Sequence, residues 1–260
     1  MMIKIRLLFL FLIFACSTSA AASMEKLQMG VSVDLVPVSS GFSGQDIVIF
    51  GSIENAEQAP LYRGEYDVIV EVIGEMEEAV VRKKERIGGI WVNAAAREYT
   101  GVPSYYSVLS RNNLGEVSDL SVLNNMGVGV DNLKARPVDR GNIQEFLTQG
   151  EFSSALRRIR IEQGLFSEDS AALEQLSPSL FRATLSLPPN VPIGVHTVKA
   201  YLFRDGKKLD EIENSFQVRK VGFERWMYDF AHNQSLLYGI MCVFLAIFTG
   251  WAANAIFRKN

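Results

Sequence analysis

Residues 188–218 read PPNVPIGVHTVKAYLFRDGKKLDEIENSFQV. The three prolines make the first part a stiff connector, because each proline ring fixes its own φ angle. A strand is predicted to follow, from Gly194 to Phe203. Asp205-Gly206 favours a tight turn, and the chain is then predicted to return as a partner strand to Val218. This stretch therefore predicts a β-hairpin entered through a proline corner.

The same order of features is typical of the closing strands of immunoglobulin-like β-sandwiches. Ile47–Phe50 is apolar without interruption, which predicts a strand buried on both faces. Further strands are predicted at residues 29–38, 66–73, 78–87 and 181–187. Residues 78–87 are expected to pair with 66–73 across a turn at Gly74-Glu75.

The middle of the chain is predicted to be helical, from about residue 140 to residue 178. Asn142 and Glu145 have the spacing of a capping box at a helix start. Phe152 and Leu156 then follow helical spacing, and Ser167 is expected to cap a further helix. The predicted fold is mainly β with an α insertion, an immunoglobulin-like β-sandwich interrupted by a helical segment. Two consecutive domains are the alternative.

The N-terminus has the features of a secretory signal peptide over residues 1–22. Basic residues precede an apolar run, and an Ala-x-Ala site follows at Ala20 and Ala22. A lipoprotein signal ending at Cys16 is a second interpretation. Either way, residues 23–225 are expected to form an exported, periplasmic domain.

A membrane helix is predicted near the other end, within residues 234–257. The segment is long enough to cross the hydrocarbon core once, at about 1.5 Å of rise per residue. Arg258 and Lys259 follow it, and basic residues favour the cytoplasmic side, so residues 258–260 are predicted to form a cytoplasmic tail. The chain is therefore expected to be a single-pass, type I protein of the inner membrane.

Composition excludes several classes of function. The chain of 260 residues has a formal net charge of −3 and lacks the basic footprint of a nucleic-acid-binding protein. All 29 acidic residues but only 22 of the 26 basic ones lie between residue 23 and about residue 233, and the net charge of this exported segment is −7. Two cysteines and two histidines offer little for metal or triad chemistry. No cofactor or metal is expected, and no catalytic motif indicates an enzyme. His196, at a strand start, is interpreted as structural.

One aromatic and polar set is a candidate interaction surface. Trp91, Asn93, Tyr105 and Tyr106 lie in two segments predicted to be loops flanking the insertion, and such side chains are enriched at interfaces. Anchoring of the core is the alternative. The basic runs at residues 82–84 and 157–160 are interpreted as solvated faces, with anion binding as the alternative.

The chain is similar to the alphaproteobacterial putative transmembrane protein family, a group of exported single-pass proteins. The resemblance lies in the motifs Phe42-Ser-Gly44, Val48-Ile-Phe50-Gly51, Arg82-Lys83-Lys84, Gly89-Ile-Trp91-Val-Asn93, Arg158-Ile-Arg160, Gly164-Leu165, Leu187-Pro188, Tyr201-Leu-Phe203-Arg-Asp-Gly206, Lys220-Val-Gly222-Phe-Glu-Arg225, Leu237-Tyr-Gly239 and Gly250-Trp251. It implies no assigned activity and no catalytic residues. Members of the family are often encoded beside a permease resembling the sulfite or organosulfonate exporters.

These observations favour a membrane-anchored binding or accessory protein that assists such a permease. Ala246 and Gly250 are spaced to form a small-residue face on the membrane helix, where a partner helix could pack closely. The alternatives are a periplasmic enzyme with a site between sandwich and insertion, and a structural envelope protein.

Overall fold

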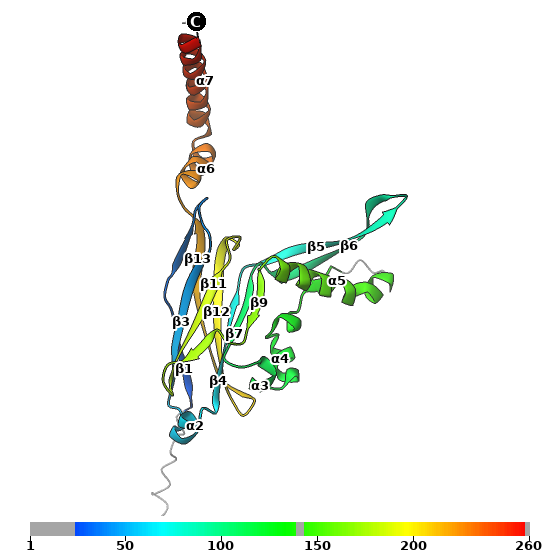
Figure 1. Cartoon of the computed structure of the whole chain (residues 1–260), viewed down its shortest axis with the longest axis vertical. Coiled ribbons are helices and arrows are strands. Elements are labelled where there is room, and N and C mark those ends of the chain that lie inside the picture. The colour runs from blue at the N-terminus through cyan, green and yellow to red at the C-terminus, as the bar shows by residue number, and fades with distance from the viewer. Residues whose placement is uncertain (1–23, 139–142, 258–260) are drawn as a thin grey trace, which may run out of the picture.

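A computed structural model describes residues 24–138 and 143–257, and the chain in it is mostly β (Figure 1). The strands are β1 (Lys26–Val31), β2 (Leu35–Val38), β3 (Gln45–Glu54), β4 (Tyr66–Ile73), β5 (Met76–Ile87), β6 (Ile90–Pro103), β7 (Tyr106–Ser110), β8 (Arg136–Pro137), β9 (Phe166–Asp169), β10 (Leu173–Gln175), β11 (Leu180–Leu187), β12 (Gly194–Arg204) and β13 (Lys207–Lys220). The helices are α2 (Gln58–Arg63), α3 (Leu114–Val117), α4 (Leu120–Met126), the 3₁₀ helix η1 (Val130–Asn132), α5 (Ile143–Glu162), α6 (Phe223–Asn233) and α7 (Ser235–Phe257).

Two sheets form the body of the molecule. The first has the strand order β1-β3-β11-β10, and the second has the order β2-β13-β12-β4-β7-β9. β3 pairs with β11 and β4 pairs with β12, so strands from before and after the insertion share both sheets. The predicted hairpin turn is confirmed: Asp205 and Gly206 have positive φ angles of 49° and 75°, as a tight β12–β13 connection requires.

The first sheet has one buried face and one solvated face. Ile47 and Ile49 on β3 are buried and point toward the core. Phe50, whose side chain points to the other face, is 47% exposed. The prediction that Ile47–Phe50 is buried on both faces is therefore wrong. The apolar run suggested burial of both faces, but the face that carries Phe50 is not fully covered by any other part of the described chain.

The strand that follows β4 leaves the sandwich instead of pairing back onto it. β5 pairs with β6 in a long hairpin, while β4 lies between β12 and β7. The predicted pairing of residues 78–87 with 66–73 is thus wrong. Gly74 explains the exit, because its N–H donates to the carbonyl of Tyr105 at 2.8 Å and a Cβ there would lie 2.5 Å from Ser104 Oγ.

The insertion is helical over a shorter stretch than the sequence predicts. α5 runs from Ile143 to Glu162, and Asn142, the predicted cap, lies outside the described residues. The second predicted helix, from Ser167, is wrong: residues 166–169 and 173–175 are the strands β9 and β10. β9 pairs in parallel with β7, and Phe166 and Leu173 are buried against the core, so tertiary packing outweighs the cap-like local sequence.

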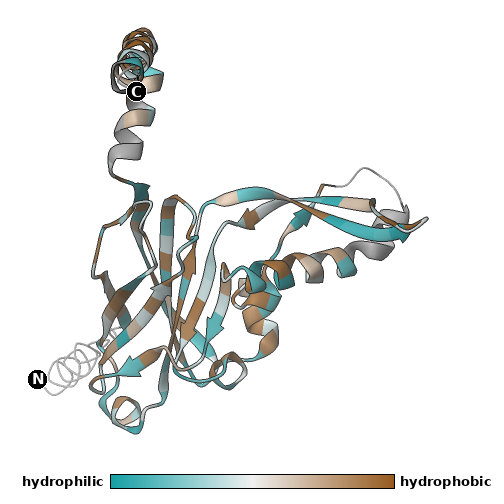
Figure 2. Ribbon diagram, turned by 45° about the horizontal axis from the view of Figure 1, so that its top comes forward, coloured by the Kyte–Doolittle hydropathy of each residue, from teal (hydrophilic) through white to brown (hydrophobic). Residues whose placement is uncertain are grey.

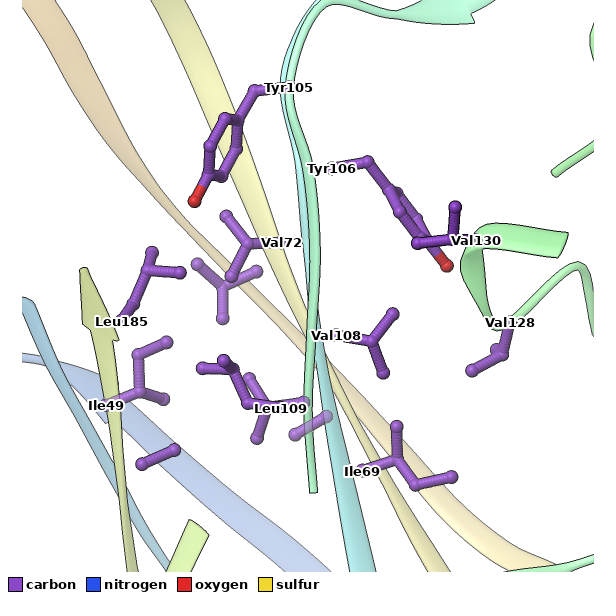
Figure 3. Close-up of a cluster of buried hydrophobic side chains, with 14 of the residues drawn as sticks. Ile49, Ile69, Val72, Tyr105, Tyr106, Val108, Leu109, Val128, Val130 and Leu185 are labelled. Carbon is purple, nitrogen blue, oxygen red and sulfur yellow. The ribbon is translucent and has the colours of Figure 1, made fainter. Parts of the chain in front are cut away.

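The second sheet is covered on both faces. Figure 3 shows Tyr105, Val72 and Leu185 on the side that faces the first sheet, and Tyr106 beside Val128 and Val130 on the other. Tyr106 and its neighbours on that outer face are covered by the segment that contains α3, α4 and η1, whose apolar residues belong to the same core cluster. This second buried face is where the segment from α3 to η1 packs on the sandwich.

The C-terminus consists of two helices that extend away from one end of the sandwich (Figure 1). α7 is mainly apolar (Figure 2), and its Ser235–Asn254 segment is long and apolar enough to span a membrane, with mean hydropathy 2.0. The mostly β fold with a helical insertion and a C-terminal apolar helix is confirmed. The predicted signal peptide at 1–22 and the tail at 258–260 lie outside the described residues.

Candidate functional site

The β5–β6 hairpin, together with α5, forms an arm that projects from the side of the sandwich (Figures 1 and 2). Its turn is Gly88-Gly89, with φ angles of 61° and 89°, a conformation that glycine adopts without steric cost. Ile87, Ile90 and Trp91 beside this turn are 59%, 66% and 69% exposed. The arm therefore ends in an apolar tip that water surrounds.

α5 packs along the base of the arm. Its Phe152 and Leu156 are buried in the same cluster as Ala79 and Val81 of β5. Arg97 of β6 lies over the Phe152 ring, with its guanidinium carbon 5.7 Å from the ring centroid. Since these are apolar contacts reinforced by a cation–π contact, α5 and the hairpin form one packed unit.

An open groove lies between β5 and α5, with a cavity volume of about 510 Å³. Charged side chains line much of it, and its other lining residues are mostly apolar. The lining residues are Val81, Arg82, Lys83, Lys84, Glu151, Phe152, Ser154, Ala155, Arg158 and Ile159. Its volume lies in the range of small-ligand pockets, about 300–1,000 Å³.

The groove carries more positive than negative charge. Lys83 Nζ lies 3.0 Å from Glu151 Oε1, which raises the pKa of Lys83 through that hydrogen bond and its charge. Arg158 Nε lies 3.8 Å from Glu162 Oε1. Within the described part of the chain, neither Arg82 nor Lys84 has a carboxylate oxygen within 4.0 Å. These two cations can therefore take an anionic partner without breaking an ion pair.

A buried carboxylate links the sandwich to the segment before η1. Glu71 on β4 is only 4% exposed, and Tyr106 Oη donates to its Oε1 at 2.5 Å. Tyr201 Oη on β12 donates to Oε2 at 2.9 Å, and the N–H of Gly129 donates to Tyr106 Oη at 2.9 Å. Both carboxylate oxygens are thus satisfied, and the network joins three strands of the second sheet to the loop before η1.

Burial sets the protonation of this network. It raises the pKa of Glu71, although the two tyrosine hydrogen bonds oppose that shift. Burial and the neighbouring Glu71 charge raise the pKa of both Tyr106 and Tyr201, which stay protonated and serve as donors. Each Glu71 oxygen accepts one hydroxyl hydrogen bond, and the residue is buried between the strands that supply the two tyrosines.

His196 is buried in the interior of the sandwich. Its ring stacks on Phe216, with centroids 5.2 Å apart, and lies 5.6 Å from the Tyr105 ring. Nδ1 lies 3.4 Å from the Gly194 carbonyl, and Nε2 has no hydrogen-bond partner among the described residues. Burial lowers the pKa of His196 below its ordinary value of 6.5. The neutral ring is therefore the form that the fold accommodates.

Acidification is expected to destabilise the fold through His196. Below pH 6.5 the histidine of the unfolded chain binds a proton that His196 in the folded chain does not. The contribution of His196 to stability is therefore complete above pH 6.5 and declines as the pH falls. Each unit of pKa lowering corresponds to about 1.4 kcal/mol. We expect His196→Leu to show a smaller difference between thermal unfolding midpoints at about pH 8 and about pH 5 than the unmodified protein.

His232 is the matched control, because the chain has two histidines and His232 lies exposed on α6. His232→Gln should retain the full pH dependence. Burial raises the pKa of Glu71, so the contribution of Glu71 to stability grows as the pH falls, opposite to that of His196. Glu71 is present in every variant, so the comparison between variants isolates the histidine. Equal pH dependence in His196→Leu and the unmodified protein would contradict this assignment.

The structure separates the residues of the predicted interaction surface. Trp91 and Asn93 are exposed on β6 near the tip of the arm. Tyr105 and Tyr106 are buried on opposite faces of the second sheet, so the prediction that all four share one surface is wrong. Burial raises the pKa of Tyr105 to about 12. Adjacent residues of a strand point to opposite faces, and both faces are covered here.

The predicted helix-packing residues lie on α7. Ala246 and Gly250 are exposed, and no atom of the described chain lies within 4 Å of where a Cβ of Gly250 would be. Gly239 and Val243 line a shallow apolar groove on the same side of the helix. Helical spacing therefore places Gly239 and Val243 on the same side as Ala246 and Gly250, in the two turns nearer the sandwich.

Two features of the site were missed at the sequence level. The groove was missed because Arg82 and Arg158 come from distant segments, whose basic runs were each interpreted as a solvated face. The Glu71 network was missed although a signal was present: Ile69 and Ile73 share the face of Glu71. An apolar pair flanking a carboxylate on one strand face indicates that the face is covered.

The family model described as "Putative transmembrane protein (Alph_Pro_TM)" matches residues 26–259. No curated protein matches the chain. Among solved structures, Spo0M, a sporulation control protein from Bacillus subtilis, is similar with 9% identity and a TM-score of 0.31, covering 81% of this chain and 56% of its own. A putative beta-galactosidase from Bacteroides fragilis has 10% identity and a TM-score of 0.27, covering 76% of this chain and 18% of its own. AggA, the major subunit of an Escherichia coli fimbria, has 7% identity and a TM-score of 0.24, covering 76% of this chain and 95% of its own. The chain thus spans less than two thirds of Spo0M and of the beta-galactosidase.

Proposed function

The chain belongs to the family described as putative transmembrane protein, and from this membership we propose that it is a membrane-anchored, periplasmic binding or accessory protein. α7 crosses the inner membrane once, and the sandwich with its arm lies in the periplasm. The apolar length of α7 supports the anchor. The basic residues Arg258 and Lys259, and the signal-like N-terminus, support the orientation.

The observation that carries the binding role is the basic groove between β5 and α5. The exported segment is acidic, with a net charge of −7, yet Arg82, Lys83, Lys84 and Arg158 gather in one open groove. Charge of one sign concentrated in a concave surface attracts and orients partners of the opposite sign. The groove therefore suits an anionic group presented by another molecule.

The proposed partner is an inner-membrane permease of the sulfite or organosulfonate exporter type, bound through an acidic periplasmic segment. The anchor confines both proteins to the same membrane, which raises their effective concentration. The small-residue face of α7, with Ala246 and Gly250, provides a second contact within the bilayer. The groove and the helix face would act together on one partner.

Charge reversal in the groove is expected to release this partner. In Arg82→Glu/Arg158→Glu, recovery of the permease with the affinity-purified chain should fall about tenfold or more, because a hydrogen bond to a charged group contributes about 1.5–3 kcal/mol. The measurement is quantitative mass spectrometry after purification from detergent-solubilised membranes. Both side chains are exposed, so the fold should tolerate the change.

Arg63→Glu is the matched control. Arg63 is exposed, pairs with Glu65, and lies on α2 at the opposite end of the sandwich (Figure 1). It reverses a charge outside the groove and should leave recovery unchanged. Gly250→Leu should also weaken recovery, through the membrane contact. If all three variants recover the permease equally, or if no permease is recovered with the unmodified chain, the proposed partnership is wrong.

The role we propose is non-catalytic. The junction of sandwich and insertion holds one buried carboxylate, Glu71, and two tyrosine hydroxyls occupy its oxygens. In the groove, the titratable side chains are cationic apart from Glu151, which pairs with Lys83. Such a lining suits recognition of an anion.

A further inference from the structure

The tip of the arm combines apolar and charged side chains at the end of a paired hairpin. Ile87 and Ile90 pair across the strands, and Trp91 pairs with Arg86. Lys84 lies on the same strand as Ile87 and is exposed, as is Arg86, whose Nε donates to the Gly89 carbonyl at 3.4 Å. A three-residue apolar end is therefore followed by Lys84, Glu85 and Arg86, which together carry a net charge of +1.

This composition is typical of segments that enter a membrane interface. Tryptophan and branched aliphatic side chains partition into the boundary between headgroups and acyl chains, while lysine and arginine stay among the headgroups. Each cation near an anionic leaflet contributes attraction that falls off within about a Debye length. Ile87, Ile90 and Trp91 supply the first component, and Lys84 and Arg86 supply the second.

The arm slants toward the end of the sandwich from which α6 and α7 extend. Figure 1 shows the hairpin running obliquely to the side, so that its tip lies at about the height of that end, with α6 and α7 continuing beyond it. At that end, Tyr228 and His232 stack on α6 with centroids 4.0 Å apart, and Phe230 of α6 contacts Tyr238 of α7. These aromatic residues precede or begin the apolar span, which is where side chains of this type meet the headgroups. The tip thus lies beside the sandwich end from which the chain leaves, and α6 spans the interval between that end and α7.

We propose that the tip of the β5–β6 hairpin inserts into the interface of an anionic lipid bilayer, as a second membrane contact beside α7. The inference rests on the membrane anchoring in the proposed function. Three apolar side chains are too few for a stable protein interface, which buries about 1,200–2,000 Å². A lipid surface needs no such area, because α7 already holds the tip close to it. Two attachments fix how the arm and its groove stand above the membrane.

The test is an environment-sensitive probe at the tip of the full exported chain held in lipid nanodiscs by α7. The chain has two cysteines, so Cys16→Ser/Cys242→Ser removes both. Asn93→Cys then places a nitrobenzoxadiazole label beside Trp91 without altering the apolar residues. Tyr62→Cys, on α2 at the far end, is the matched position, because Tyr62 is 75% exposed. Nanodiscs contain either phosphatidylcholine alone or phosphatidylcholine with phosphatidylglycerol.

We expect the emission at position 93 to shift to shorter wavelength with phosphatidylglycerol, and to be quenched by spin-labelled lipid, while position 62 stays unchanged. Ile87→Ser/Ile90→Ser/Trp91→Ser should abolish the shift, and Lys84→Gln/Arg86→Gln should remove its dependence on phosphatidylglycerol. The proposal is overturned by no shift at position 93, by an equal shift in both lipids, or by a shift that survives the serine variant. A shift that appears only with co-reconstituted permease would identify the tip as a protein contact and overturn lipid insertion. None of these failures bears on permease recovery through the groove.

Discussion

Replacing Gly51 with alanine is expected to lower the free energy of unfolding by about 3 kcal/mol or more, which makes it one of the most damaging single changes in the sandwich. Gly51 lies on β3, with its open side facing the core. The ring of Phe181 on β11 fills this space, and an added Cβ would lie 2.5 Å from Phe181 Cζ. It would also overlap the carbonyl oxygen of Gln28 on β1.

The clash has no inexpensive relief. The ring could change rotamer, but the Gln28 carbonyl belongs to the backbone of a paired strand, which can move only if the β1–β3 ladder opens. Gly41→Ala is the matched control, since nothing lies within 4 Å of a Cβ there. Its effect should stay within about 0.5 kcal/mol. Chemical denaturation of the purified variants measures both, and equal midpoints would contradict the packing described for Gly51.

The closing strands could be predicted from the sequence because their signals are local. Strand β12, the Asp205-Gly206 turn and the returning strand all follow from turn chemistry and strand-forming residues within one short segment. The helix of the insertion and the apolar C-terminal helix were predictable for the same reason. A helix of that length and apolarity has few alternatives.

The arm could not be predicted, because its pairing depended on a choice between two turns. Gly74-Glu75 and Gly88-Gly89 both allow a hairpin, and only tertiary packing at Gly74 directs the chain out of the sheet. The Gly88-Gly89 turn was a usable signal, since paired glycines favour two-residue hairpin loops. That signal does not decide which of the two hairpins forms, so the pairing of β5 with β6 depends on the tertiary contacts.

The site was harder to predict than the fold. Trp91 and Tyr106 carry the same kind of local signal, an aromatic residue in a partly polar context, yet one is exposed and the other buried. Their difference arises from the segment around η1, which covers the outer face of the second sheet. Likewise, Arg82 and Arg158 lie far apart in the sequence and come together only because α5 packs on β5.

Two aspartates in the middle of α7 are expected to detach the chain from the membrane. An aspartate at the centre of a membrane helix costs about 2.5–3.5 kcal/mol on the insertion scale, whereas apolar residues such as leucine each contribute only about 0.3–0.6 kcal/mol in favour. Phe244→Asp/Leu245→Asp places both charges at the centre of the Ser235–Asn254 span, with both native side chains exposed. Insertion should therefore become unfavourable.

The most direct measurement is carbonate extraction of membranes, followed by the fraction of the chain that stays in the pellet. It is made in a Cys16→Ser background, so that a lipid on that cysteine cannot hold the protein. Leu236→Asp/Leu237→Asp is the matched control, with the same charge change at the headgroup end of the helix, where its cost is small. We predict that the unmodified α7 and this control stay in the pellet, while Phe244→Asp/Leu245→Asp moves to the supernatant. Retention of all three in the pellet would contradict a membrane anchor formed by α7.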